Sequence, residues 1–128
     1  MDGRAGTGRS REQDALGRWG EDLAAQHLTA AGLEVLERNW RCREGELDVV
    51  ARESDGTVVF VEVKTRSSAA FGEPSEAVSR AKAARIRTLA CRWLLQHPSG
   101  GVPLRFDVIS VLRRTGAAPV VRHLRSAF

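Results

Sequence analysis

The chain has 128 residues, of which 20 are basic and 16 acidic, so its formal net charge is +4. This length fits one domain with its own core, and a composition of 42% apolar and 28% charged residues excludes a wholly disordered or collagen-like chain. No apolar run is long enough to span a membrane, no signal-peptide pattern follows the first residues, and two cysteines form no disulfide framework, so we expect a cytoplasmic protein.

Charge is segregated along the chain. Six acids and one base lie in residues 44–62, whereas five bases and no acid lie in residues 80–92. Only Lys64 and Lys82 are lysines, and the other 18 basic residues are arginines. Two interpretations are open. The charged runs are either solvated surface, where most such runs lie, or a polyanion-binding surface around an acidic centre.

The first part of the chain predicts a tail and a helix. Residues 1–12 are rich in Gly, Arg and Ser and predict a disordered tail, followed by a single domain over residues 13–128. Apolar residues at helical spacing predict a helix from Gln13 to Ala31, and Gly32 predicts its end.

Three strands are predicted next, over residues 33–39, 45–52 and 57–64. In the second strand, alternation places Leu47, Val49 and Ala51 on one face, with Glu46, Asp48 and Val50 on the other. The third strand is apolar on both faces until Glu62, which is typical of a central strand that is covered on both sides.

The remainder of the chain predicts a loop, a helix and two strands. Residues 65–75 form the loop, and Ser79 is a good N-cap for a helix that runs to about His97. Strands are predicted over residues 104–112 and 119–124. The order α-β-β-β-α-β-β indicates an α/β protein in which a mixed sheet is flanked by helices.

The turn between the second and third predicted strands determines which of their side chains lie opposite each other. If residues 54–56 form a three-residue loop with Gly56 in the left-handed conformation, Asp48 lies opposite Glu62 and Glu46 lies opposite Lys64, all on one face. A two-residue turn would instead bury Asp48 in an apolar layer at a cost of several kcal/mol. We therefore favour the three-residue loop.

Two carboxylates this close repel each other unless a positive charge lies between them. Either Lys64 or a divalent metal could supply that charge, and oxygen-only ligands suit Mg²⁺ or Mn²⁺ rather than zinc. Glu21 lies at the border of the apolar stripe of the first helix among small residues, so it is either a third acid of the same site or an exposed helix acid.

Several short motifs of the chain resemble those of a known protein family. The chain from about Ala15 to Phe128 resembles the YraN-type family of uncharacterised bacterial proteins, which is similar to Holliday-junction resolvases and to the PD-(D/E)xK superfamily of restriction-endonuclease-like folds. The residues that carry the resemblance are Glu21, Asn39-Trp40-Arg41, Gly45-Glu46-Leu47-Asp48, Val61-Glu62-Val63-Lys64-Thr65-Arg66, Phe71-Gly72, Arg105-Phe106-Asp107-Val108 and Ser126-Ala127-Phe128. Leu47 stands where the superfamily name has Pro.

The resemblance implies a role for each matching residue. Asp48 and Glu62 would ligate Mg²⁺ or Mn²⁺ together with the backbone carbonyl of Val63, and Lys64 would orient or deprotonate the attacking water. Glu21 would bind a second metal or a metal-bound water. Glu46 would be an outer partner of Lys64.

The resemblance and the basic segments together predict a nucleic-acid partner. Candidate contacts, each weighed against solvation or core packing, are Arg66, Arg80, Lys82, Arg85, Arg87, Trp40 and Arg41. Arg105 and Asp107 are expected to brace the sheet rather than to catalyse.

We therefore expect a Mg²⁺-dependent endonuclease that acts on DNA, including branched or structured DNA, and a homodimer by analogy with resolvases. The alternatives are a non-catalytic nucleic-acid-binding module of nuclease fold and a structural scaffold in which the acidic cluster is a salt-bridge network.

Overall fold

The computed structural model describes residues 10–67 and 78–128 of the chain. Residues 1–9 of the disordered tail predicted over residues 1–12 lie outside the described residues, and residues 11 and 12 belong to the first helix instead. Most of the loop predicted over residues 65–75 also lies outside the described residues. None of the helices in the described part is long and apolar enough to cross a membrane.

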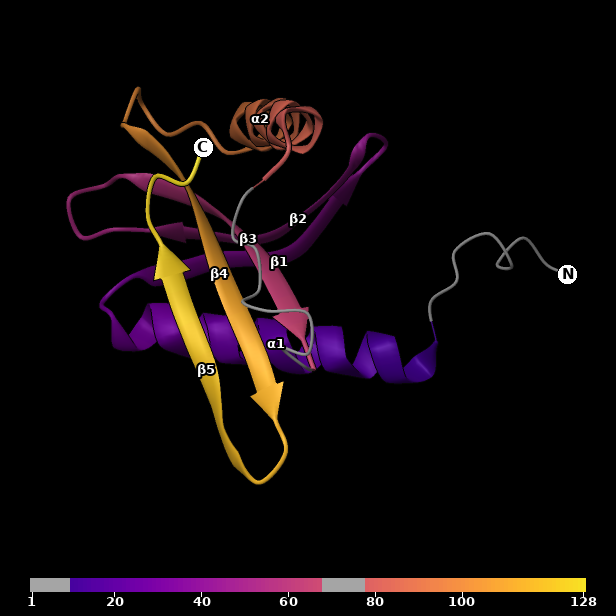
Figure 1. Ribbon diagram of the computed structural model, residues 1–128. Coiled ribbons are helices and arrows are strands. Elements are labelled where there is room, and N and C mark those ends of the chain that lie inside the picture. Colours follow the sequence, from indigo (N-terminus) through magenta and orange to yellow (C-terminus); the bar gives the residue numbers. More distant parts are fainter. Residues whose placement is uncertain (1–9, 68–77) are drawn as a thin grey trace, which may run out of the picture.

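The elements follow in the predicted order α-β-β-β-α-β-β (Figure 1). They are α1 (Arg11–Ala30), β1 (Glu34–Cys42), β2 (Gly45–Arg52), β3 (Val58–Arg66), α2 (Arg80–Gln96), β4 (Leu104–Arg114) and β5 (Ala117–Leu124). β3 runs two residues beyond its predicted end at Lys64.

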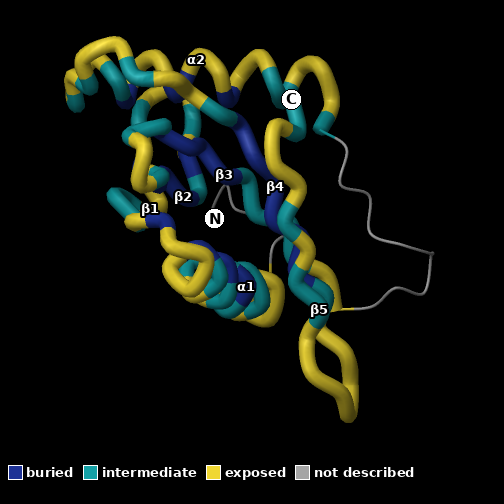
Figure 2. The backbone as a smooth tube through the Cα atoms, turned by 90° about the vertical axis from the view of Figure 1, so that its left-hand side faces the viewer, coloured by how far each residue is buried: buried dark blue, intermediate teal, exposed yellow. Residues whose placement is uncertain are grey.

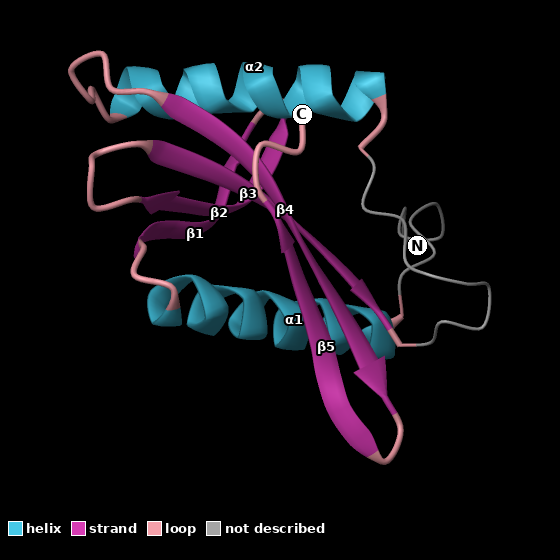
Figure 3. Ribbon diagram, turned by 60° about the vertical axis from the view of Figure 1, so that its left-hand side comes forward, coloured by secondary structure: helices cyan, strands magenta, loops and turns pink. Residues whose placement is uncertain are grey.

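The five strands form one mixed sheet in the order β1-β2-β3-β4-β5, with β3 in the centre as predicted. β3 and β4 are parallel, and the other neighbouring pairs are antiparallel. Figure 3 shows α1 on one side of the sheet and α2 on the other, so the sheet is covered on both faces. Buried residues concentrate in the sheet between the two helices, whereas the far end of the β4–β5 hairpin is exposed (Figure 2). The structure therefore has the predicted α/β architecture of a mixed sheet flanked by helices.

α1 begins two residues before its predicted start because a capping box precedes it. The Ser10 hydroxyl accepts a hydrogen bond from the Gln13 backbone N–H at 3.0 Å, and the Gln13 side chain accepts one from the Ser10 N–H at 2.9 Å. These bonds satisfy N–H groups that the first turn of a helix leaves without partners. Gly32 follows the helix with φ +95°, which confirms it as the stop signal.

Gly20 lets α1 approach the centre of the sheet. A Cβ at this position would lie 2.0 Å from the Thr65 Oγ1 and 2.9 Å from the Thr65 Cβ on β3. The helix can therefore lie close to β3 only because residue 20 has no side chain. The same contact brings Glu21, the next residue, close to the end of β3.

Gly20→Ala should lower the free energy of unfolding by about 1–3 kcal/mol, because the overlap with Thr65 outweighs the helix propensity that alanine adds. Urea unfolding followed by circular dichroism measures this loss. The double variant Gly20→Ala/Thr65→Ala should recover part of it. A stable single variant would show that α1 does not pack this closely against β3.

The β2–β3 turn confirms the predicted three-residue loop. Gly56 has φ +95°, and the Glu53 N–H donates to the Thr57 carbonyl at 2.9 Å. The ladder then pairs Arg52 with Val58 and continues in register to Val49 and Val61. The register is therefore the one that places Asp48 level with Glu62.

The predicted face of Leu47 on β2 is wrong. Leu47 packs with Val50 and Trp40 in the core under α2, whereas Val49 belongs to the core under α1. The alternation of β2 changes phase between Leu47 and Val49. At the same level, the neighbouring strand β1 has Asn39 with φ +54°, a left-handed conformation that asparagine tolerates.

A buried polar network joins β4 and β5 to the start of the C-terminal segment. Asp107 is fully buried and accepts two hydrogen bonds from Arg105, both at 2.9 Å. It also accepts one from His123 at 2.8 Å and one from the Ser126 N–H at 3.0 Å. His123 in turn lies 3.1 Å from a ring nitrogen of His27 on α1. These contacts confirm that Arg105 and Asp107 brace the sheet.

Candidate functional site

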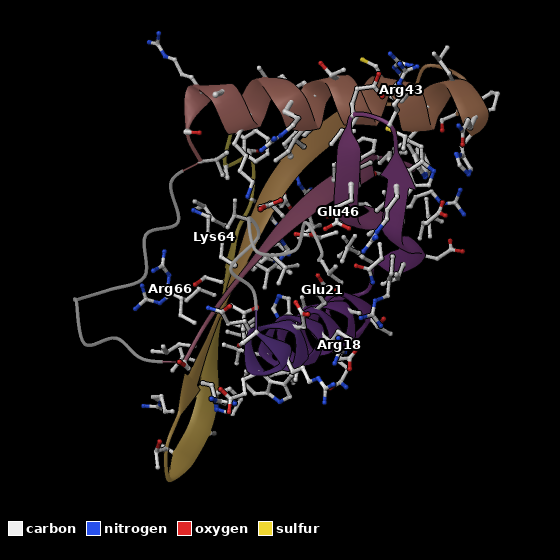
Figure 4. All side chains as sticks on the ribbon, turned by 90° about the vertical axis from the view of Figure 1, so that its right-hand side faces the viewer. Arg18, Glu21, Arg43, Glu46, Lys64 and Arg66 are labelled. Atoms are coloured by element: carbon white, nitrogen blue, oxygen red, sulfur yellow. The ribbon has the colours of Figure 1, made fainter. Side chains whose placement is uncertain are left out.

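A pocket opens where β2 and β3 separate. Their ladder ends at Val49 and Val61, and Figures 3 and 4 show the two strands diverging beyond this point. The pocket has a volume of about 1160 Å³. Residues from α1, β1, β2, β3 and the first turn of α2 line it: Gln13, Asp14, Leu16, Gly17, Arg18, Glu21, Asn39, Arg41, Glu46, Asp48, Glu62, Val63, Thr65, Arg66, Ser67 and Lys82.

Asp48 lies at the point where the strands part. Its carboxylate accepts a hydrogen bond from the Val63 backbone N–H at 2.9 Å, so a side chain serves this N–H just beyond the last paired residues. Burial and the neighbouring Glu62 carboxylate raise the pKa of Asp48 to about 8. The structure therefore brings together the two acids that the register predicted. Burial, together with the repulsion from Glu62, favours the protonated form of Asp48 near neutral pH.

Glu62 forms an ion pair with a lysine of α2. Its side chain is only 12% exposed, and its carboxylate lies 2.5 Å from the Lys82 ammonium group. Lys82 is in the first turn of α2, where Ser79 caps the helix by accepting from the Lys82 N–H at 3.1 Å. Lys82, which the sequence predicts to contact a nucleic-acid backbone, therefore lines the pocket.

Glu21 lines the same pocket from α1. The sequence had left open whether Glu21 belongs to the site or is an exposed helix acid. Burial raises the pKa of Glu21, a hydrogen bond with Asn39 opposes this, and the negative charge of Glu46 raises it further. Figure 4 shows Glu46 on β2 above Glu21 on α1. The pocket is therefore lined by five carboxyl groups, those of Asp14, Glu21, Glu46, Asp48 and Glu62.

The predicted opposition of Glu46 and Lys64 is wrong. The β2–β3 ladder ends before it reaches these residues, and Glu46 instead accepts a hydrogen bond from Arg41 on β1 at 3.1 Å. Lys64 follows Glu62 on β3 (Figure 4), but the lysine that lines the pocket is Lys82. The strands separate because each follows a different neighbour. β2 stays paired with β1, and β3 stays paired with β4 to its end.

The donors in the pocket fit a hard divalent cation. The charged neighbours of Asp48 are the carboxylates of Glu62, Glu21 and Glu46, which offer oxygen donors, and a divalent cation would offset the repulsion between Asp48 and Glu62. Within residues 10–67 and 78–128, no three His, Cys, Asp or Glu side chains are already arranged to hold a metal. A site here would therefore rest on two carboxylates completed by backbone and water oxygens, which is a usual donor set for Mg²⁺.

Of the predicted nucleic-acid contacts, Arg41 and Arg66 line the pocket with Lys82. Arg80 and Arg85 are exposed on α2. Arg87 is also exposed, but its guanidinium lies 4.8 Å from the centre of the Phe106 ring and 5.9 Å from that of Phe128. It therefore packs on the C-terminal segment as well as facing solvent.

Trp40 is not available to stack a base. It is 8% exposed and belongs to the core under α2. The alternative of core packing is therefore confirmed for this residue, and the base-stacking prediction is wrong. The left-handed conformation of the preceding Asn39 turns Trp40 toward that core.

Arg18 and Asn39 are among the pocket residues to which the sequence argument gave no role in the site. Arg18 lies one helical turn before Glu21, and Asn39 hydrogen-bonds to Glu21. A spacing of three residues before an acid on a helix would have indicated Arg18. No local signal indicates Asn39, because its role depends on a backbone conformation that only the folded hairpin shows.

Comparison with known proteins gives a consistent family and no activity. A sequence profile described as "Uncharacterised protein family UPF0102" matches residues 20–111. A UPF0102 protein of Frankia casuarinae is 55% identical over 118 residues, covering 92% of this chain and 99% of its own length. One of Beutenbergia cavernae is 57% identical over 115 residues, covering 90% and 97%. The structure of Pyrococcus furiosus SfsA in complex with Ca²⁺ aligns with a TM-score of 0.36 and 15% identity, over 88% of this chain and 63% of that one.

Proposed function

The chain belongs to the uncharacterised protein family UPF0102, and we propose that it is a Mg²⁺- or Mn²⁺-dependent endonuclease that hydrolyses phosphodiester bonds in DNA, including branched or structured DNA. The observation that supports this most is the partly buried pair of Asp48 and Glu62 in an open pocket with basic residues around it. A like-charged pair of this kind costs stability when it is ionised. Its presence in a pocket therefore points to a ligand that brings positive charge.

Each acid has a position suited to part of this task. Asp48 and Glu62 would hold the cation, with the carbonyl of Val63 as a third donor, because Asp48 already contacts the backbone of Val63. The bound cation would supply a nucleophilic water and stabilise the anionic phosphorane. Glu21 would orient groups from the α1 side of the pocket. Glu46 would hold Arg41 rather than Lys64 in position.

The basic residues define how DNA would approach. Arg41 and Arg66 contribute charge on the β1 and β3 sides of the pocket, and Arg18 contributes charge from α1. Lys64, at the end of β3, would orient or deprotonate the attacking water and offset phosphate charge. DNA would thus lie across the opening between β2 and β3, with phosphates facing arginines and the scissile bond over Asp48.

Cleavage assays test this proposal. Purified protein is incubated with labelled four-way junctions, duplexes and single strands in Mg²⁺, Mn²⁺ or EDTA, and we expect cleavage only with metal. Glu62→Gln should reduce the rate by about 100-fold or more, because it weakens the hold on the cation. Lys64→Met should also reduce it.

Glu44→Gln is the matched control, since Glu44 is a surface acid paired with Arg92 outside the pocket. It should leave cleavage unchanged. Activity that survives Glu62→Gln would overturn the assignment. DNA binding that weakens steeply with salt, without cleavage in either metal, would instead favour a binding module.

A further inference from the structure

Lys82 breaks a local rule of helix structure. It is the third residue of α2, and the first turn of this helix holds no acid. The N-terminal end of a helix carries a partial positive charge, so a cation there is disfavoured and an acid is preferred. A residue that opposes local preference is expected to have a tertiary reason. Here that reason is its contact with Glu62 on β3.

The contact is asymmetric in its exposure to solvent. The Glu62 side chain is 12% exposed, whereas the Lys82 side chain is 41% exposed and also lines the pocket. Glu62 is therefore fixed at the base of the pocket, and the ammonium group of Lys82 can turn toward the opening on its flexible four-carbon stem. The Glu62 carboxylate therefore stays in place, whereas the Lys82 ammonium group can move.

We propose that Lys82 is a built-in counter-ion of Glu62, which a divalent cation displaces and which then binds a phosphate of the nucleic acid. This inference rests on the proposed function, because it takes Glu62 as a metal ligand. In the absence of metal, Lys82 neutralises Glu62. When metal binds, the ammonium group is released beside the phosphate that the site must hold.

The charges of the pocket support this exchange. A bound cation and Lys82 would both contact Glu62, and two positive groups at one carboxylate repel each other. Lys82 is therefore expected to leave Glu62 when metal enters. An arginine would serve less well, since its planar guanidinium can hold a carboxylate by two hydrogen bonds and so resist release.

The first test measures Mn²⁺ binding by calorimetry in the absence of DNA. Lys82→Met removes the competing charge while keeping the length of the side chain, so the affinity for Mn²⁺ should rise about tenfold. Lys82→Arg keeps the charge and should bind Mn²⁺ no better than the wild type. Arg80→Met removes a charge from the same helical turn, and it should change the affinity less than twofold.

The second test measures DNA affinity on a labelled duplex with phosphorothioate linkages, with and without Mn²⁺. Mn²⁺ should increase the affinity of the wild type more than that of Lys82→Met. In Mn²⁺ the salt dependence of Lys82→Met should be lower by about one phosphate contact. Lys82→Gln repeats both measurements if Lys82→Met folds poorly.

The outcomes separate this inference from the proposed function. Mn²⁺ binding that is lost in Asp48→Ala but unchanged in Lys82→Met would overturn the counter-ion role alone. No Mn²⁺ binding by either the wild type or Lys82→Met would overturn both proposals. Binding by Lys82→Met that exceeds that of the wild type, with a smaller DNA response to metal, supports the exchange.

Discussion

Asp48→Asn should make the metal-free protein more stable at pH 8 and at the same time abolish its binding of Mn²⁺. Burial and the Glu62 carboxylate raise the pKa of Asp48 to about 8, so the fold disfavours the ionised form of this side chain. Asparagine has the same shape and no charge, and its side-chain oxygen can still accept the hydrogen bond from the Val63 N–H. We expect a gain of roughly 2–5 kcal/mol in the free energy of unfolding.

The sign of the pH dependence follows from the raised pKa. The folded state binds the proton of Asp48 more tightly than the unfolded chain, where the carboxyl has its ordinary pKa of 3.8. The protonated form therefore stabilises the fold fully below pH 3.8, and this contribution is lost as the pH rises through about 8. Asp48→Asn has no such group. Its advantage over the wild type should be small near pH 4, increase toward pH 8 and then level off.

Urea unfolding in EDTA at several pH values between 4 and 9 measures this difference. Asp22→Asn is a suitable control, because Asp22 is an exposed acid paired with Arg38 on the surface. Its effect on stability should change little over the same range. An Asp48→Asn protein that is less stable than the wild type at pH 8 would show that the fold does not disfavour the ionised form of Asp48.

The sequence predicted the acid pair because turn chemistry sets strand register. Gly56 in the left-handed conformation selects a three-residue loop, and the loop fixes which residues of β2 and β3 face each other. This information is local, since it depends on a few adjacent residues. For the same reason Ser79 and Gly32 correctly marked helix ends, and the apolar character of residues 58–61 correctly marked the central strand.

The wrong predictions concern features that depend on contacts between elements distant in the sequence. Extending the register to Glu46 and Lys64 assumed that β2 and β3 stay paired to their ends, whereas each strand follows its other neighbour. The face of Leu47 was wrong because strict alternation was assumed along β2, whereas its phase changes between Leu47 and Val49, level with the left-handed Asn39 of β1. The contact between Lys82 and Glu62 joins α2 to β3 across the site, so its position depends on how the helix packs.

The family motif that contains Asp107 has a structural role rather than a chemical one. Asp107 does not line the pocket, and its carboxylate is fully buried with hydrogen bonds from β4, β5 and the C-terminal segment. His123 and its neighbour His27 are 96 residues apart in the chain, so spacing alone could not have placed them together. The sequence identified Arg105 and Asp107 as bracing residues but not the histidines that extend the network.

Asp107→Asn should therefore cost about 3–5 kcal/mol of stability at pH 7. The substitution removes the charge that Arg105 and His123 contact and replaces one acceptor oxygen by a donor NH₂ group, which cannot accept from Arg105, His123 or the Ser126 N–H. Burial alone would raise the pKa of Asp107, but the hydrogen bonds from His123, Arg105 and the Ser126 N–H outweigh it and lower the pKa to about 2. The ionised form is thus the one that stabilises the fold.

The pH dependence of this variant should be opposite in sign to that of Asp48→Asn. A lowered pKa contributes stability that is present above the unfolded value of 3.8 and lost as the pH falls through about 2. The deficit of Asp107→Asn should therefore be full at pH 7 and shrink between pH 4 and pH 2. Urea unfolding measures it, with Glu53→Gln as the control, since Glu53 also contacts Arg105, at 2.9 Å, but is 25% exposed. A loss in the free energy of unfolding no larger than that of Glu53→Gln would contradict the stabilising role of the buried Asp107 network. An Asp107→Asn protein that folds at low temperature should still bind Mn²⁺, because Asp107 supports the sheet outside the pocket, whereas Asp48 forms the pocket itself.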